Sequence, residues 1–303
     1  MYQLGHSPTP TAAHPAGVID IGGSHITAAI VELDPTPRVL ARSGAAIDTH
    51  GAREKLLGAL HAAVSNVAAS AERWTIAMPG PFDYERGIGT FDGVAKFSTL
   101  AGLDLRAQFS SMLGIDQSRV SFINDAIAYG TGEWFVSDAR PARFVCITLG
   151  TGVGSAFLDG GRPVEEGRSV PPHGWAHLLE VGGAPLEDAV STRAIRRRYA
   201  EAGGDDLSVR EIAGHARAGE SRASTVLTTA MHELGEALGP WIERFHATEV
   251  VVGGSMSRSW DLLGAAFEDG LRDHRVGTAT IRPSVLFDDA PLVGCAASVA
   301  LRH

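Results

Sequence analysis

The fold of this chain is decided by the stretch Gly17-Val-Ile-Asp-Ile-Gly-Gly-Ser24, which is followed at once by His25-Ile-Thr-Ala-Ala-Ile-Val-Glu-Leu33. An apolar run ends in a pair of glycines, and a second run rich in β-branched residues begins directly after them. Two strands joined by so short a glycine turn form a hairpin. We therefore predict a β-hairpin at the start of the folded part, after a polar leader, residues 1–16, that is predicted to be disordered.

The same arrangement occurs again in the middle of the chain. Phe144-Val-Cys-Ile-Thr-Leu149 has the composition of a buried strand, and it ends at Gly150-Thr-Gly-Val-Gly154. Residues 155–158 are predicted to be its partner strand. Such a recurrence indicates an internal structural duplication, and a duplicated α/β unit predicts a two-lobed molecule with a central cleft.

The remaining elements follow from the spacing of apolar residues. Helices are predicted at residues 52–70, 126–135, 224–246 and 291–301, and further strands at 74–78, 120–124 and 249–252. We expect a smaller N-terminal lobe made of residues 17–124 and completed by the C-terminal helix 291–303. A larger C-terminal lobe is expected from residues 125–290.

The composition excludes several classes of protein. The chain has 303 residues, of which 44% are hydrophobic and 20% charged, enough for two packed lobes. A net charge of −9 argues against nucleic-acid binding, which requires a cationic surface. Cys146 and Cys295 lie far apart within apolar runs, so we expect buried thiols and no disulfide. We see neither a secretion signal nor an apolar run of about 20 residues, and we expect a cytoplasmic protein without a membrane partner.

The two glycine loops have the composition of phosphate-binding sites, because backbone N–H groups without neighbouring side chains can approach an anion closely. The first loop offers Gly22, Gly23 and the hydroxyl of Ser24, and Asp20 just before it could hold Mg²⁺ through water. The second loop offers Gly150, Thr151, Gly152 and Gly154. The alternative for the first loop is a tight turn that needs glycine for a positive φ.

Further chemistry is indicated where two other strands end. Asp125 is suited to accept the proton of a hydroxyl that attacks phosphorus, and Asn124 is suited to bind a sugar hydroxyl. The alternative for both residues is a cap for the following helix. Gly253 and Gly254 end a later strand, where a nucleoside could lie against bare backbone.

In their order and spacing, these segments resemble the ROK family of bacterial sugar kinases. The motifs that carry the resemblance are Asp20-Ile-Gly-Gly-Ser24, Pro79-Gly-Pro-Phe-Asp83, Asn124-Asp-Ala126 with Gly132-Glu133, Gly150-Thr-Gly-Val-Gly154 and Val251-Val-Gly-Gly254. The resemblance implies an α/β, two-lobed actin/hexokinase-like (ribonuclease H-like) fold with mixed sheets flanked by helices. It also implies ATP and Mg²⁺ in the cleft, Asp125 as catalytic base, Asn124 and Gly80 on the sugar side, and a homodimer.

The chain departs from the family pattern in the sugar-binding region. His177 matches a family histidine and Glu187 a later sugar-binding glutamate, but Gly174 stands where the resemblance implies another glutamate. The family's cysteine-rich zinc loop has no cysteines here, so we expect no structural zinc. Lys96 replaces a sugar-binding asparagine, and it is either a sugar or phosphate donor or a solvated loop charge.

These features predict ATP-dependent phosphorylation of a hexose, or of a modified amino or deoxy hexose, and the resemblance implies the 6-hydroxyl. One alternative donor is inorganic polyphosphate, which an arginine run at Arg193, Arg196, Arg197 and Arg198 would suit. Another alternative is a sugar-sensing regulator. We expect regulators of this kind to carry a DNA-binding domain before the first glycine loop, where only about 16 residues stand here.

Overall fold

The computed structural model describes residues 15–67, 71–274, 276 and 279–301. The first of its two large sheets has the strand order β3-β2-β1-β4-β7. Its members are β1 (Ala16–Ile21), β2 (His25–Glu32), β3 (Arg38–Ala46), β4 (Trp74–Met78) and β7 (Val120–Asn124). Strands β1, β2 and β3 pair antiparallel in chain order, whereas β4 is parallel to β1 and β7 is parallel to β4.

The second sheet repeats this arrangement with the order β10-β9-β8-β13-β14. Its members are β8 (Arg143–Leu149), β9 (Val153–Asp159), β10 (Arg162–Pro163), β13 (Glu249–Gly253) and β14 (Thr280–Pro283). Again three strands pair antiparallel in chain order and two further strands pair parallel. The predicted duplication is therefore confirmed at the level of sheet topology, with hairpin β8–β9 standing in its sheet where β1–β2 stands in the other.

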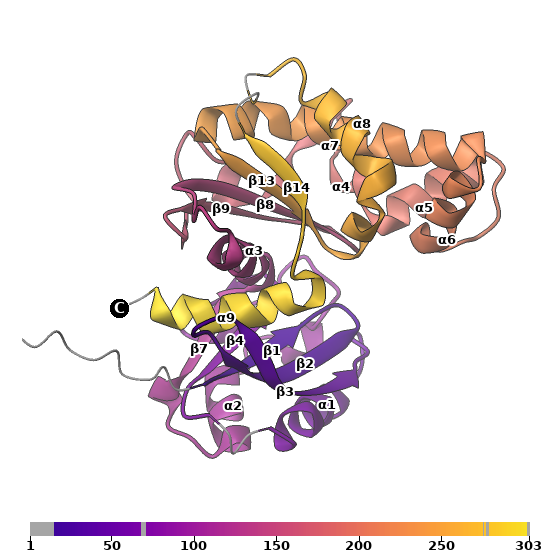
Figure 1. Ribbon diagram of the computed structural model, residues 1–303. Coiled ribbons are helices and arrows are strands. Elements are labelled where there is room, and N and C mark those ends of the chain that lie inside the picture. The colour runs from indigo at the N-terminus through magenta and orange to yellow at the C-terminus, as the bar shows by residue number, and fades with distance from the viewer. Residues whose placement is uncertain (1–14, 68–70, 275, 277–278, 302–303) are drawn as a thin grey trace, which may run out of the picture.

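Helices cover both faces of each sheet because successive residues of the central strands point to opposite sides. In β1, Ile19 packs with α1 (Arg53–Ser65) and α2 (Leu105–Leu113), whereas Val18 packs with α3 (Asp125–Val136) and α9 (Ala290–Ala300). Figure 1 shows α3 and α9 lying between the two sheets, with α9 returning from the far end of the chain to β1 and β4.

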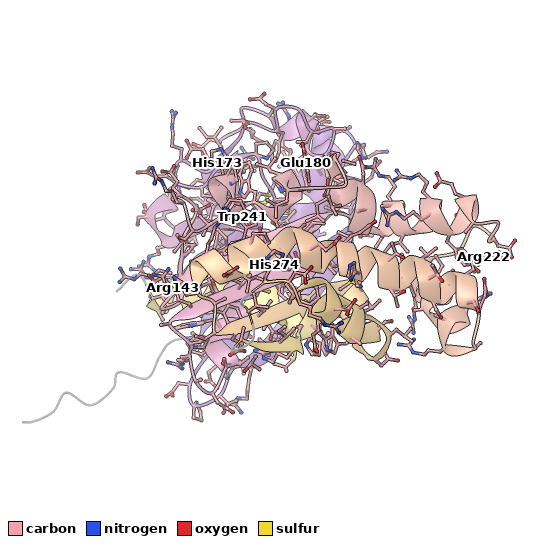
Figure 2. The ribbon with its side chains drawn as sticks, turned by 90° about the horizontal axis from the view of Figure 1, so that it is seen from above. Arg143, His173, Glu180, Arg222, Trp241 and His274 are labelled. Atoms are coloured by element: carbon pink, nitrogen blue, oxygen red, sulfur yellow. The ribbon has the colours of Figure 1, made fainter. Side chains whose placement is uncertain are left out.

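The outer face of the second sheet is covered by a larger helical layer. It consists of α4 (Glu187–Val190), α5 (Thr192–Glu201), α6 (Val209–Arg217), α7 (Ser221–Phe245) and α8 (Trp260–Gly270). Seen from above, α7 extends from Arg222 towards Trp241, and the segment marked by His173 and Glu180 lies to one side of it (Figure 2). In the described ranges, no helix has the combination of length and apolar character required to cross a bilayer.

Short elements complete the chain. Two small sheets pair β5 (Phe82–Asp83) with β6 (Ile88–Gly89) and β11 (Glu180–Val181) with β12 (Ala184–Pro185). Short 3₁₀ turns lie at Ser98–Leu100, Gln117–Arg119, Pro172–Gly174, Ala176–Leu178, Ser255–Ser259 and Phe287–Asp289.

Some predicted bounds differ from the structure. Ala16 already pairs in β1, so the predicted leader is one residue too long, and residues 1–14 lie outside the described part. Helix α1 ends at Ser65, and residues 68–70 of the predicted helix also lie outside the described part of the chain. Strand β9 begins at Val153 because Val153 already pairs with Leu149.

Candidate active site

The first glycine loop joins β1 to β2 with exposed backbone. The N–H of Gly22 donates to the carbonyl of His25 at 2.9 Å and closes the hairpin. Neither Gly22 nor Gly23 has a positive φ, so the alternative that this turn requires glycine for its conformation is wrong. A Cβ at Gly22 would approach His25 O at 3.4 Å, and one at Gly23 would lie 3.5 Å from Lys96 Nζ. The loop therefore leaves room for a ligand to approach its backbone.

The second glycine loop is held tightly by its surroundings. A Cβ at Gly150 would meet no described atom within 4 Å. In contrast, a Cβ at Gly152 would lie 2.2 Å from Glu187 Oε1, and one at Gly154 would lie 2.7 Å from Ala126 Cβ. Glu187 also accepts the N–H of Val153 at 3.1 Å. Glycines 152 and 154 thus let the loop fit between Glu187 and the start of α3, while Gly150 and the exposed Thr151 face open space.

Asn124 and Asp125 lie where β7 passes into α3. The Oδ1 atom of Asn124 accepts the N–H groups of Ala126 and Ile127 at 3.0 and 3.1 Å, so the predicted cap is confirmed. Its Nδ2 donates to the hydroxyl of Tyr84 at 3.0 Å. Asp125 also accepts the Ala126 N–H, at 2.9 Å. The cap fixes the backbone from which the Asp125 carboxylate projects.

Charged groups from several segments act on this carboxylate. Burial raises the pKa of Asp125, and the positive charge of Lys96 is among the influences that lower it. Burial, followed by the negative charges of Asp125 and Asp288, raises the pKa of Asp20 from 3.8 to about 7. Since Lys96 Nζ is also close to Gly23, the first loop, the lysine and the two carboxylates occupy one region.

The predicted sugar-side residues lie around the same helix start. The hydroxyl of Tyr84 donates to Met78 O at 3.0 Å, and a Cβ at Gly80 would lie 3.6 Å from that hydroxyl. Burial lowers the pKa of His177, and the carboxylate of Glu187 opposes this shift. Gly80 is therefore close to Asn124 through Tyr84, and Glu187 links His177 to the second glycine loop.

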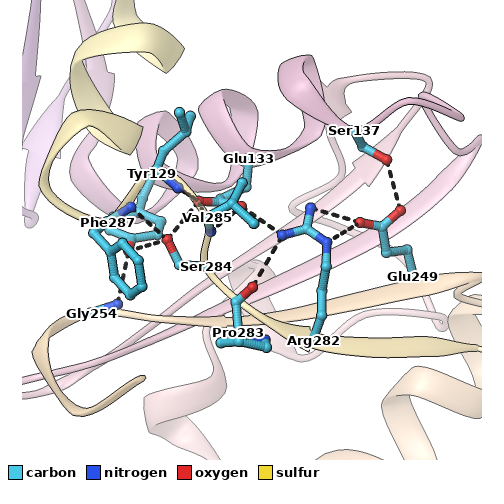
Figure 3. A network of polar contacts seen from close by, with 11 residues as sticks. Tyr129, Glu133, Ser137, Glu249, Gly254, Arg282, Pro283, Ser284, Val285 and Phe287 are labelled. Atoms are coloured by element: carbon cyan, nitrogen blue, oxygen red, sulfur yellow. Dashed lines mark hydrogen bonds and ion pairs between the residues drawn. The ribbon is translucent and has the colours of Figure 1, made fainter. Parts of the chain in front are cut away.

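Gly253 and Gly254, at the end of β13, allow close packing in addition to any role in ligand binding. A Cβ at Gly253 would lie 2.4 Å from the ring of Tyr129, and one at Gly254 would lie 2.3 Å from Leu149 O. The hydroxyl of Tyr129 accepts the Gly254 N–H at 3.1 Å and donates to Ser284 Oγ at 2.9 Å (Figure 3). Tyr129 stands one turn after Asp125, so α3 connects the proposed base to this pair.

A buried ion-pair network continues from there along α3 (Figure 3). The carboxylate of Glu133 is fully buried and accepts from Arg282 Nη1 at 2.8 Å and from Ser284 Oγ at 2.5 Å. It also accepts the N–H groups of Val285 and Leu286. Arg282 in turn donates to Glu249 at 2.8 Å. A buried charge is stable only when fully paired, so this network fixes the segment that leads from β14 to α9.

The arginine run does not form a free cationic patch. In order, Arg193, Arg196, Arg197 and Arg198 pair with Asp188, Asp206, Glu201 and Glu233. The N···O distances in these pairs are 3.1, 2.6, 3.8 and 2.6 Å. The paired carboxylates neutralise much of the charge that a polyanion would require.

Sequence reasoning missed Tyr84, Glu165 and Asp288. Glu165 lines a pocket together with Asn124, His173 and Trp175. The negative charge of Asp288, in the loop before α9, adds to the burial that raises the pKa of Asp20. The only sequence signal was that Tyr84 directly follows the Pro79–Asp83 motif. Glu165 and Asp288 come near the site through the fold, from segments without a glycine or strand-end pattern.

Comparisons with known proteins identify the family. The chain matches the profile of the ROK family over residues 16–302. It is 26% identical to a glucokinase of Thermotoga maritima over 255 residues, which make up 75% of this chain and 78% of that enzyme.

Solved structures have the same fold. A ROK family glucokinase from Streptomyces griseus, in complex with glucose and AMPPNP, aligns with a TM-score of 0.77 at 23% identity, covering 94% of this chain and 98% of that one. An inorganic polyphosphate/ATP-glucomannokinase from Arthrobacter sp. strain KM aligns with a TM-score of 0.66 at 26% identity, over 95% and 99% of the two chains. The predicted actin/hexokinase-like fold is confirmed, and the chain belongs to the ROK family.

Proposed function

We propose that this sugar kinase of the ROK family transfers the terminal phosphoryl group of ATP to the 6-hydroxyl of a hexose or modified hexose, with Asp125 as general base. One observation carries the proposal: Lys96 lies beside Gly23 of the first glycine loop, and its charge also acts on Asp125. A phosphate-binding backbone, a cation and a carboxylate are thus next to one another. Phosphoryl transfer needs these three components, because it depends on positioning, charge neutralisation and a base.

The phosphates of ATP would lie between the two glycine loops, which come from the matching hairpins of the duplicated sheets. Gly23 and Ser24 would bind from one side and Thr151 from the other, while the N–H groups of Gly22 and Gly150 bond within their own loops, to His25 O and Gly152 O, and hold the loop shape. The exposed backbone of Gly23 beside Lys96 and the open space around Gly150 support this assignment. Gly152 and Gly154 would act indirectly, by allowing the second loop to pack against Glu187 and α3.

The site has the ligand chemistry that Mg²⁺ prefers. Asp20 and Asp125 lie close enough for the charge of one to raise the pKa of the other, and a divalent cation between phosphate and carboxylate would remove that repulsion. Mg²⁺ takes few protein carboxylates and keeps several waters. We assign Asp20 as the residue that would hold Mg²⁺ through water, where the ion would neutralise charge on the phosphates.

The acceptor sugar would lie against Asn124, Asp125, His177 and Glu187. One N–H of the Asn124 amide is engaged with Tyr84 and its oxygen caps α3, so only its second N–H is left for a sugar oxygen. Burial lowers the pKa of His177, which favours the neutral imidazole, and a neutral imidazole can both donate and accept. Asp125 would take the proton of the attacking hydroxyl as the new O–P bond forms.

Polyphosphate remains the competing donor. The Arthrobacter structure is named for a glucomannokinase that uses both polyphosphate and ATP. In this chain, however, the arginines that would suit a long polyanion are paired with carboxylates. We therefore propose ATP as the physiological donor.

The test is an ADP-release screen over glucose, its epimers, and amino, N-acetyl and 6-deoxy hexoses, with wild type and Asp125→Asn side by side. We expect Mg²⁺-dependent turnover of a small set of sugars and none of a 6-deoxy sugar. Asp125→Asn should lower kcat by about 10²–10⁴-fold, the usual contribution of a general base, while ATP affinity is retained.

Three outcomes would contradict parts of this proposal. Near-normal turnover by Asp125→Asn would remove Asp125 as the base. ATP binding without turnover of any sugar would favour the sensor alternative. Faster phosphorylation of the same sugar from polyphosphate, measured as the sugar phosphate formed, would replace ATP as the donor.

A further inference from the structure

The position where the resemblance implies a sugar-binding glutamate is a glycine in a strained backbone conformation in this protein. Gly174 has φ of +71°, a conformation that L-residues rarely adopt. A Cβ there would lie 3.2 Å from Val164 O and 3.4 Å from Glu165 Cα. The carbonyl of Gly174 also accepts the hydroxyl of Ser155 at 2.6 Å, which holds this backbone in place. A glutamate at residue 174 would therefore be strained and would have to displace its neighbours slightly.

A different carboxylate begins next to that position. The Cγ of Glu165 lies 3.9 Å from where a Cβ of residue 174 would be. Glu165 and Gly174 line one pocket, and its other walls include Asn124, Ile127, His173 and Trp175. Glu165 therefore shares a pocket with Asn124, which directly precedes the proposed base in the chain.

The charge of Glu165 reaches the same tyrosine as the charge of Asp125. Burial raises the pKa of the Tyr84 phenol, and the negative charges of Asp125 and Glu165 raise it further. The Tyr84 hydroxyl accepts a hydrogen bond from the Asn124 amide. Burial and then the charge of Glu166 raise the pKa of Glu165, and His173 opposes this shift. Glu165 thus shares its surroundings with residues of both the Asn124–Asp125 segment and the Pro172–Gly174 turn.

An aromatic surface stands beside this carboxylate. The ring of Trp175 is 36% exposed. Its centroid lies 4.9 Å from that of His173 and 5.4 Å from that of His177, and the latter pair is stacked. A carboxylate that accepts hydroxyl hydrogens, next to an exposed aromatic face that covers C–H groups, provides both kinds of contact that a sugar ring offers.

We propose that Glu165 supplies the sugar-binding carboxylate that Gly174 cannot, and that Glu165, His173 and Trp175 form the wall that selects the sugar. This inference rests on the proposed function, because it names a ligand for the same acceptor. An ionised carboxylate accepts hydrogen bonds and donates none, so this wall favours hexoses that present a hydroxyl or an ammonium group to it. Amino hexoses gain most, since their bond to the carboxylate is charge-assisted.

The test compares Glu165→Gln with wild type and with Glu180→Gln, an exposed glutamate on the same lobe. Glutamine keeps the size of the side chain and removes its charge. For the best sugar from the screen, Glu165→Gln should raise the sugar KM by about 10- to 100-fold, the factor for losing a hydrogen bond to a charged group. The KM for ATP and the far-ultraviolet circular dichroism should not change, and Glu180→Gln should match wild type.

A deoxy series shows whether the contact is direct. In wild type, removing one particular sugar hydroxyl, or replacing an amino group by hydrogen, should raise KM by a similar factor. In Glu165→Gln the same analogue and its parent sugar should then have nearly equal KM values. An unchanged sugar KM in Glu165→Gln, with wild type active, overturns this inference alone. Inactivity of wild type on every sugar instead overturns the proposed function, and the inference with it.

Discussion

At the scale of single residues, Lys96 shows how a buried neighbour positions a charge. Phe97 is buried, has φ of +60°, and its N–H donates to Thr49 O at 2.7 Å. These contacts fix the loop and leave the ammonium group of Lys96 beside Gly23. In that place the lysine would neutralise the phosphoryl group during transfer, and its charge also lowers the pKa of Asp125 against the effect of burial.

We predict that Lys96→Met lowers kcat by about 10²–10³-fold, the usual effect of removing one electrostatic donor from a transition state. Without the positive charge, the pKa of Asp125 rises further, so the base is ionised only at higher pH. The acid limb of the kcat–pH profile should therefore move to higher pH.

The control is Lys55→Met, which changes the other lysine of the chain, an exposed residue of α1. Steady-state kinetics from about pH 4, near the ordinary pKa of an aspartate, to about pH 9 would measure kcat and the position of the acid limb. Unchanged kcat and an unmoved acid limb in Lys96→Met would identify the lysine as a solvated loop charge.

The sequence located some of these residues but not their interactions. Asp20 and Asp125 stand at strand ends next to glycine or helix-cap patterns, so local sequence was enough to propose them. The role of Lys96 stayed open because its neighbour Gly23 is distant in the chain. Asn124 was assigned to the sugar, yet its oxygen caps a helix, and local sequence allowed both.

At the scale of elements, α3 and α9 touch backbone to backbone. A Cβ at Gly132 would lie 2.0 Å from Ala290 O, and a Cβ at Gly294 would lie 1.7 Å from Ala128 O. These two glycines allow the helices to approach more closely than side chains would permit. Since α3 begins at Asp125 and α9 packs on β1, the contact couples the proposed base to the first sheet.

Gly294→Ala should therefore destabilise the protein by about 1–3 kcal/mol, the usual cost of overpacking a core. The matched control is Gly214→Ala in α6, where a new Cβ would meet no described atom within 4 Å. There the higher helix propensity of alanine should be neutral or add up to about 1 kcal/mol. Urea unfolding measures both changes, and equal stabilities of the two variants would show that the helices can separate without cost.

Three edge strands of the large sheets escaped prediction, namely β3, β14 and the two-residue β10, whose residues are both exposed. Strand β3 has exposed residues at every second position and no buried residue, and β14 has none either. Such strands carry too few apolar side chains to be recognised, and their pairing depends on the neighbouring strand in the folded sheet. The central strands β1, β8 and β13 were found because both of their faces are buried.

At the scale of the whole molecule, three distant segments bring carboxylates to one place. Asp20 ends a strand of the first sheet, Asp125 begins α3, and Asp288 lies in the loop before α9. The sequence predicted two lobes from the repeated hairpin, and the matching sheet topologies bear this out. It could not predict Asp288, because nothing local marks a loop that the return of α9 brings to the cleft.

The burial of Asp20, together with the nearby charges of Asp125 and Asp288, predicts a pH-dependent stability for the ligand-free protein. The pKa of Asp20 is 3.8 when unperturbed and about 7 in the fold. The folded state therefore holds a proton that the unfolded state has released, and stability is lost as pH rises from about 4 to 7. Asp20→Asn removes this loss, so it should raise Tm by a few degrees at pH 8 and by less at pH 5. Differential scanning calorimetry without Mg²⁺ or nucleotide measures both values, and equal gains would contradict the shift.

The cap on α3 has an effect beyond its hydrogen bonds. The aligned peptide groups of a helix form a macrodipole that places about half a positive elementary charge at its first turn, which is where the carboxylate of Asp125 is attached. This partial charge favours the ionised carboxylate and opposes the effect of desolvation. By holding that first turn in helical form, Asn124 helps to keep its neighbour in the ionised form that can accept a proton, a contribution to acid–base chemistry that requires no contact with the substrate.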